Sequence, residues 1–147
     1  MSSAAKVTRL ADYKPYEFEI KTTELSFDIQ EGQTTVDSRL QIERVNPDAT
    51  DIFLDGTDLE LLRVCVNGRE LSGNEYQVNE EGMTIFGVEK EFSLQVSTKI
   101  IPESNKRLMG LYKSRHTNST QCEAQGFRRM TFYPDRPDVQ SEFTNHI

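Results

Sequence analysis

The chain is poor in the residues that most often carry catalysis or covalent cross-links. Its 147 residues include two histidines, two cysteines and no tryptophan. The two cysteines, Cys65 and Cys122, do not predict a disulfide framework, so we expect a protein of the cytoplasm. The two histidines, His116 and His146, are far apart and belong to no H-E-x-x-H motif. We therefore expect no metal site formed by this chain alone.

Long apolar runs are missing as well. No stretch approaches the ~18 apolar residues of a membrane-spanning helix, and residues 1–20 have no apolar centre typical of a signal peptide. The formal net charge of −7 argues against nucleic acid, because phosphate groups bind clustered Lys and Arg. The one basic cluster, residues 105–115, is interpreted as a solvated loop. We expect neither a membrane span nor a nucleic-acid partner.

What the chain does contain is apolar residues at every second position, which is typical of strands with one buried face. No window of eleven or more residues has a convincing helical period. The turn pair Asn67-Gly68 is a strong hairpin signal. We predict an antiparallel all-β chain, either a β-sandwich or a curved open sheet. Its expected strands fall within residues 16–20, 25–29, 36–42, 52–54, 59–66, 76–78, 83–88 and 92–100.

The pattern changes after this regular part. Residues 103–138 are polar and lack alternation, which predicts an irregular functional loop. Residues 139–147 resemble the start of another strand that the chain end interrupts. That abrupt end suggests a truncated domain.

The candidates for chemistry are concentrated between Thr120 and Val139, and each has a simpler alternative. Cys122 is either a nucleophile that uses a distant histidine as its base or an inert packing thiol, and we favour the second. The run from Asp135 to Asp138 is interpreted as a turn in which Arg136 pairs with an aspartate. A carboxylate held near apolar groups without a cation is costly and favours a positively charged ligand. Glu123 is therefore either a solvated side chain or a ligand contact.

Residues 121–139 read QCEAQGFRRMTFYPDRPDV and closely resemble a signature of the bacterial aminopeptidase N family. These proteins are alanyl aminopeptidases, which are zinc metallopeptidases. Residues 110–114, GLYKS, resemble the G-L-Y-x-S of the same family, and residues 13–16, YKPY, are similar to its opening. The resemblance is most specific from Gly110 to Val139 and weaker per residue before Leu108.

The resemblance implies a saddle-shaped, all-β N-terminal domain that covers a thermolysin-like catalytic domain. Residues 1–147 would be that N-terminal domain, truncated at its C-terminal end. The G-A-M-E-N and H-E-x-x-H motifs of the catalytic domain are absent from this sequence. Zinc would therefore be bound outside this chain, and the chain by itself is expected to be inactive.

The resemblance also implies roles for individual residues. Gln121 matches a glutamine that lines the pocket for the first side chain of the substrate. Glu123 matches a glutamate that binds the free α-amino group of a peptide. The expected partners are thus peptides with a free N-terminus and the enzyme's own catalytic domain. Residues read as the scaffold of this loop are Arg128, Tyr133, Asp135 and Arg136. The alternative is a stand-alone, non-catalytic β-sandwich that binds peptides or a partner protein.

Overall fold

A computed structural model describes residues 7–147 of the chain. Residues 1–6, which belong to the expected domain and to the segment examined for a signal peptide, lie outside the described residues. Within 7–147, no helix has the length and apolar character needed to cross a membrane. The 3-10 helices are η1 (Leu10–Asp12), η2 (Pro102–Ser104) and η3 (Phe127–Arg129). The strands are β1 (Phe18–Gln30), β2 (Gln33–Arg44), β3 (Ile52–Asp55), β4 (Glu60–Val66), β5 (Arg69–Glu70), β6 (Tyr76–Val78), β7 (Gly82–Ile85), β8 (Glu91–Ile100), β9 (Gly110–Ser114), β10 (Thr117–Gln121) and β11 (Glu142–His146).

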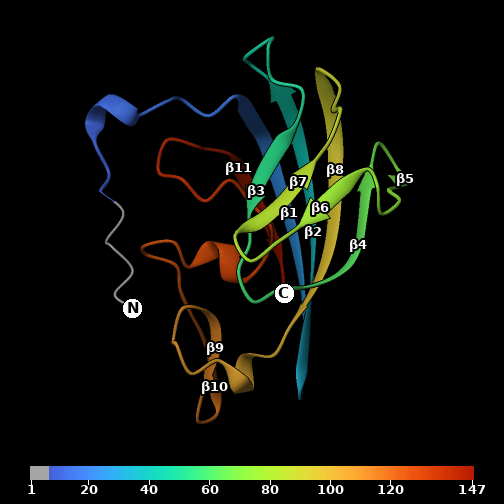
Figure 1. Cartoon of the computed structure of the whole chain (residues 1–147). Helices are drawn as coiled ribbons and strands as arrows, with labels where there is room; N and C mark the ends of the chain where they lie inside the picture. The colour runs from blue at the N-terminus through green and yellow to red at the C-terminus, as the bar shows by residue number, and fades with distance from the viewer. Residues whose placement is uncertain (1–6) are drawn as a thin grey trace.

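Most strands form two facing sheets (Figure 1). A six-stranded sheet has the order β11-β1-β2-β8-β4-β5, and a three-stranded sheet has the order β3-β7-β6. Side chains from both sheets share one apolar core, which includes Leu40 and Leu94 from the first sheet and Leu54 and Met83 from the second. The prediction of an all-β fold is confirmed.

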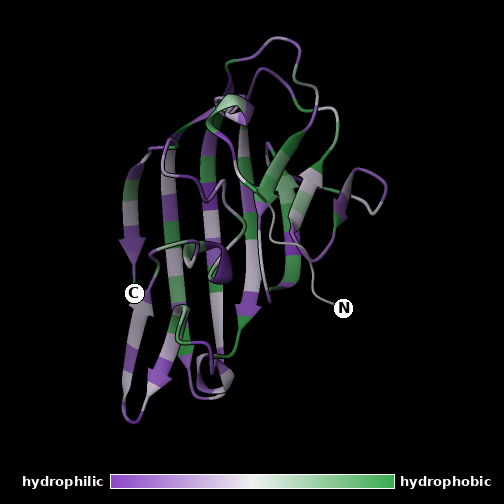
Figure 2. Cartoon of the chain, turned by 60° about the vertical axis from the view of Figure 1, so that its left-hand side comes forward, coloured by the Kyte–Doolittle hydropathy of each residue, from purple (hydrophilic) through white to green (hydrophobic). Residues whose placement is uncertain are grey.

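Alternation of apolar and polar residues explains why these segments pair as they do. Along β8, every second residue from Phe92 to Ile100 is buried. Leu94 lies opposite Leu40 of β2, so the apolar faces of the two strands coincide. Figure 2 shows the resulting bands of hydrophobic and hydrophilic residues along the long strands. Removal of this apolar face from water favours the fold by roughly 25 cal/mol per Å².

The first two apolar series belong to one strand, which corrects the expectation of separate strands at 16–20 and 25–29. Strand β1 runs from Phe18 to Gln30 and contains a register shift between Ile20 and Thr22. Such a bulge changes which positions face the core. The buried positions are accordingly Phe18 and Ile20 before it and Thr23 and Leu25 after it. The bulge explains why the apolar series looks interrupted in the sequence.

The expectation of a purely antiparallel chain is also wrong at one edge. The expected strand after residue 139 is confirmed as β11, but it pairs with β1 in parallel, with Thr22 opposite Glu142. A parallel pair requires a connection that returns the chain to the same end of the sheet. The segment between β10 and β11 makes that return. Alternation reports which face is buried and carries no information on strand direction.

Residues 103–138 are less irregular than predicted. Strands β9 and β10 form an antiparallel hairpin within this range. The hairpin forms a sheet of its own (Figure 1), and the side chains of β10 are exposed or half-buried. A strand with both faces near solvent has no reason to alternate. The sequence pattern therefore could not reveal it.

Phe132 links the loop after β10 to the core and gives a test of the fold. Its ring is 1% exposed, and a Cβ atom added to Gly56 would overlap it. We expect Phe132→Ala to lower the free energy of unfolding by about 3–5 kcal/mol, because the substitution leaves a cavity. Urea denaturation of the chain measures this change. The control Phe86→Ala, at a position 42% exposed, should cost about 1 kcal/mol or less; equal losses would contradict the assignment.

Candidate functional site

The segment from Gln121 to Asp138, here called the 121–138 loop, is attached to the end of strand β3. Asp55 and Tyr133 exchange two backbone hydrogen bonds, of 2.9 Å from the Asp55 N–H and 3.0 Å from the Tyr133 N–H. The N–H of Thr57 donates to the carbonyl of Arg128 at 3.0 Å. These bonds satisfy backbone groups that irregular chain would otherwise leave unpaired. The loop therefore adds to the end of β3 like a short further strand.

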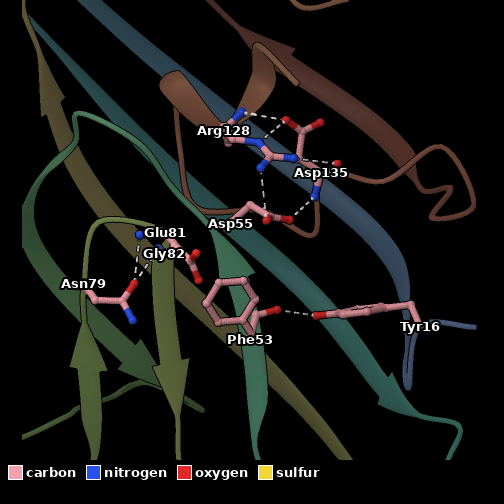
Figure 3. A network of polar contacts seen from close by, with 8 residues as sticks. All are labelled: Tyr16, Phe53, Asp55, Asn79, Glu81, Gly82, Arg128 and Asp135. Atoms are coloured by element: carbon pink, nitrogen blue, oxygen red, sulfur yellow. Dashed lines mark hydrogen bonds and ion pairs between the residues drawn. The ribbon is translucent and has the colours of Figure 1, made fainter. Parts of the chain in front are cut away.

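An ion network reinforces this attachment (Figure 3). The Arg128 Nε–H donates to Oδ2 of Asp135 at 3.0 Å, and Arg128 Nη1 lies 3.3 Å from Oδ1 of Asp55. The backbone N–H of Asp135 donates to Oδ2 of Asp55 at 2.9 Å. Burial raises the pKa of the Asp55 carboxyl, although the Asp135 N–H and the Arg128 charge act in the opposite direction. Charge-assisted hydrogen bonds of this kind are stronger than neutral ones.

A second contact joins the loop to the N-terminal segment. Arg136 binds the Asp138 carboxylate through two nitrogens, at 2.9 Å and 2.7 Å, which confirms the predicted pairing with an aspartate. The same guanidinium donates to the Lys14 carbonyl at 2.7 Å. It also lies 6.0 Å from the ring centre of Tyr13 and 5.6 Å from that of Tyr16. Cation–π contacts at these distances add to the hydrogen bonds.

A tight turn carries the two residues predicted to bind substrate. Gln121 is the last residue of β10, and the N–H of Gly126 donates to the Cys122 carbonyl at 2.8 Å. A Cβ atom on Gly126 would overlap the Gln121 carbonyl oxygen and lie 2.8 Å from Cα of Cys122, so the turn has no room for a larger residue. The Gln121 Nε2 donates to the Glu123 carbonyl at 2.8 Å. Both side chains are exposed.

The structure thus brings Gln121 and Glu123 together on one turn, and their substrate-binding roles stay a prediction. Within residues 7–147, no side chain is hydrogen-bonded or ion-paired to the Glu123 carboxylate. Glu123 stands in solvent, whereas the sequence analysis considered a carboxylate near apolar groups. The turn therefore presents a solvent-exposed carboxylate, and not a buried one, to a cation.

The described residues do not fit a metal ion. No group of three or more His, Cys, Asp or Glu side chains between residues 7 and 147 is arranged to hold one. His146 Nε2 lies 3.0 Å from the Glu24 carboxylate on the neighbouring strand, and His116 is exposed in the turn between β9 and β10.

Sequence reasoning missed Asp55 as part of the site. It predicted only a short strand at residues 52–54, and Asp55 follows that strand 80 residues before its partner Asp135. The four scaffold residues were identified through the resemblance, and their contacts agree with that role. A carboxylate directly before glycine at a strand end was the only local signal.

The attached, polar loop on two packed sheets defines a class of protein, a β-sandwich domain that presents residues from a supported loop. Within this class, the chain belongs to the Peptidase M1 N-terminal domain family, which matches residues 13–147. The resemblance to aminopeptidase N is confirmed by curated relatives. Aminopeptidase N of Caulobacter vibrioides is 42% identical over 142 residues, covering 97% of this chain and 16% of that protein. Aminopeptidase N of Escherichia coli is 35% identical over 136 residues, covering 92% of this chain and 15% of that protein.

Solved structures share the fold. Legionella pneumophila aminopeptidase A in complex with aspartic acid superposes with a TM-score of 0.87 at 24% identity, over 94% of this chain and 17% of that chain. An M1 zinc metallopeptidase from Deinococcus radiodurans gives a TM-score of 0.72 at 16% identity, over 88% of this chain and 32% of that chain. The chain spans about one sixth of the length of the curated relatives it matches.

Cys122 offers a test of the nucleophile interpretation. Burial, with a smaller contribution from the charge of Asp135, raises the pKa of its thiol. At a given pH less thiolate is then present, and thiolate is the reactive form. We expect iodoacetamide to modify Cys122 more slowly in the folded chain than in urea-unfolded chain at mildly alkaline pH. Mass spectrometry separates it from the buried Cys65, and faster modification in the folded chain would restore the nucleophile interpretation.

Proposed function

We propose that this chain is the N-terminal domain of a longer zinc-dependent aminopeptidase, and that its Glu123 binds the free α-ammonium group of a peptide substrate. One observation carries the proposal: the Glu123 carboxylate, which pairs with no side chain among residues 7–147, stands on a turn that is attached to the sandwich. An aminopeptidase must distinguish a terminal ammonium from an internal amide. Charge-assisted hydrogen bonds to a carboxylate supply that difference.

The rigidity of the turn matters as much as its charge. Only the first peptide bond should reach the reacting groups, so the amine must be held at a defined distance from them. The Gly126 N–H bond to the Cys122 carbonyl and the Gln121 amide bond to the Glu123 carbonyl restrict the turn. In the proposal, Gln121 also forms one wall of the pocket for the first side chain. Zinc and the groups that cleave the bond belong to the rest of the longer protein.

The domain range and location are part of the proposal. Residues 1–147 would continue into a catalytic domain, which the one-sixth coverage of the curated relatives supports. A cytoplasmic location is supported by two cysteines that are unpaired in the fold. Cell fractionation tests the location, and recovery from an oxidising compartment would contradict it.

The product of the complete gene tests the enzyme assignment against a stand-alone binding module. We expect it to hydrolyse alanine p-nitroanilide and to lose this activity with a zinc chelator, whereas residues 1–147 alone should be inactive. N-acetylated alanine p-nitroanilide is the control and should not be cleaved, because its amine cannot carry a charge. A complete product that binds peptides without cleaving them would support the binding module instead.

Glu123 can be tested in the same full-length protein. We expect Glu123→Ala to lower kcat/KM for alanine p-nitroanilide roughly 30- to 900-fold, because an ammonium would lose its charged partner. This factor corresponds to a loss of ~2–4 kcal/mol in transition-state binding free energy. The matched control is Glu89→Ala, since Glu89 is an exposed glutamate outside the loop. Wild-type values of KM and kcat/KM in Glu123→Ala would show that the amine is bound elsewhere.

A further inference from the structure

Residues 55–58, the last residue of β3 and the turn that follows it, carry the 121–138 loop. Besides the backbone bonds of Asp55 and Thr57, its Asp58 forms an ion pair with Arg129 at 2.6 Å. Asp58 is 72% exposed in its side chain, whereas Asp55 is 20% exposed. An exposed ion pair contributes little to a fixed geometry because water and salt screen it. Asp55 is therefore the acid of this turn that can restrict the loop.

The two carboxylate oxygens of Asp55 reach two different parts of the loop. Oδ2 accepts the N–H of Asp135, in the later part. Oδ1 faces Arg128 in helix η3, in the earlier part. Arg128 also binds Asp135 directly, at 3.0 Å from its Nε. One side chain thus fixes the distance between the two parts and the position of both relative to β3.

A short series of backbone contacts leads from this network to Glu123. The residue after Arg128 donates its N–H to the Gly126 carbonyl at 3.1 Å, and the Gly126 N–H donates to Cys122 at 2.8 Å. Glu123 is the next residue. Because the backbone of Gly126 lies close to Gln121 and Cys122 and is hydrogen-bonded on both sides, we expect a shift of η3 to move the turn as well. The position of the Glu123 carboxylate therefore depends on that of Arg128.

A stabilising role alone does not account for a charged residue at position 55. Burial raises the pKa of its carboxyl, so the ionised form is kept there at a cost in free energy. Buried ion pairs are weak evidence for net stability, since apolar side chains of similar volume often serve as well. The contacts of Asp55 are directional. Its two oxygens reach the Asp135 N–H and Arg128 together only when the two parts of the loop lie as they do here.

We propose that Asp55 is a positioning residue for the amine-binding turn, acting through Arg128 and Asp135 to set where the Glu123 carboxylate meets the substrate. This inference rests on the proposed function and names the residue on which its amine selectivity depends. Asp55 itself does not touch substrate. Its removal should weaken binding of the amine more than the chemical step.

The test uses the full-length protein and two inhibitors that differ only in the amine, alanine hydroxamate and propionohydroxamate. The ratio of their inhibition constants measures amine selectivity. We expect Asp55→Ala to reduce this selectivity roughly tenfold and to raise KM for alanine p-nitroanilide by a similar factor, with kcat within about twofold. Asp55→Asn retains an acceptor oxygen for the Asp135 N–H, so its loss should be about threefold.

The control and the double variant make the result specific. Asp51 precedes β3 and its carboxylate accepts the Gly87 N–H at 2.9 Å, so Asp51→Asn should keep wild-type selectivity. Thermal unfolding checks folding, and Asp55→Asn, which keeps the volume, carries the test if Asp55→Ala is unfolded. In a Glu123→Ala background, Asp55→Ala should cause no further loss of selectivity, since no carboxylate is left to misplace.

Two other results would overturn the inference. Selectivity that falls equally in both backgrounds, or that is unchanged by Asp55→Ala although Glu123→Ala reduces it, rules out the positioning role and leaves the proposed function intact. Selectivity that Glu123→Ala itself leaves unchanged removes the proposed function, and the role of Asp55 with it.

Discussion

The Asp55 carboxylate accepts a hydrogen bond from the backbone of Asp135, 80 residues further along the chain. With Arg128 beside it, this contact turns a long polar connection into a fixed part of the sandwich. Order in such a connection is costly, at roughly 1–2 kcal/mol of conformational entropy per residue. The buried ring of Phe132 helps to offset that cost, and the paired charges restrict how the loop lies against β3.

The fold separates the residues that support the 121–138 loop from the exposed residues that the loop presents. The two sheets bury most of the apolar side chains, and Phe132 and Tyr133 of the 121–138 loop join their common core. The loop is also attached at β3 and, through Arg136, at the N-terminal segment. Functional residues are often placed on loops that a rigid scaffold positions. Here the scaffold residues contact one another and β3. Among residues 7–147 no side chain pairs with the Glu123 carboxylate, to which the proposed function assigns an amine.

Individual strands show how much of the fold local sequence patterns can predict. The alternation from Phe92 to Ile100 predicted β8 correctly, because one face of that strand is fully buried. Strand β10 escaped prediction because its side chains stay near solvent and nothing selects an alternating pattern. In β1, the bulge after Ile20 shifted the buried positions and made one strand look like two. Each error arose where the pattern of burial differed from simple alternation.

The sequence by itself determined the all-β class, the turn at Asn67-Gly68 and the motif that carries Gln121 and Glu123, since each depends on neighbouring residues. Only the tertiary structure decided that β11 runs parallel to β1 and that Asp55 pairs with the distant loop. Direction and pairing partner depend on where the chain returns in space. The Asp55 side chain at the end of β3 forms its contacts only when folding brings Arg128 and Asp135 next to it.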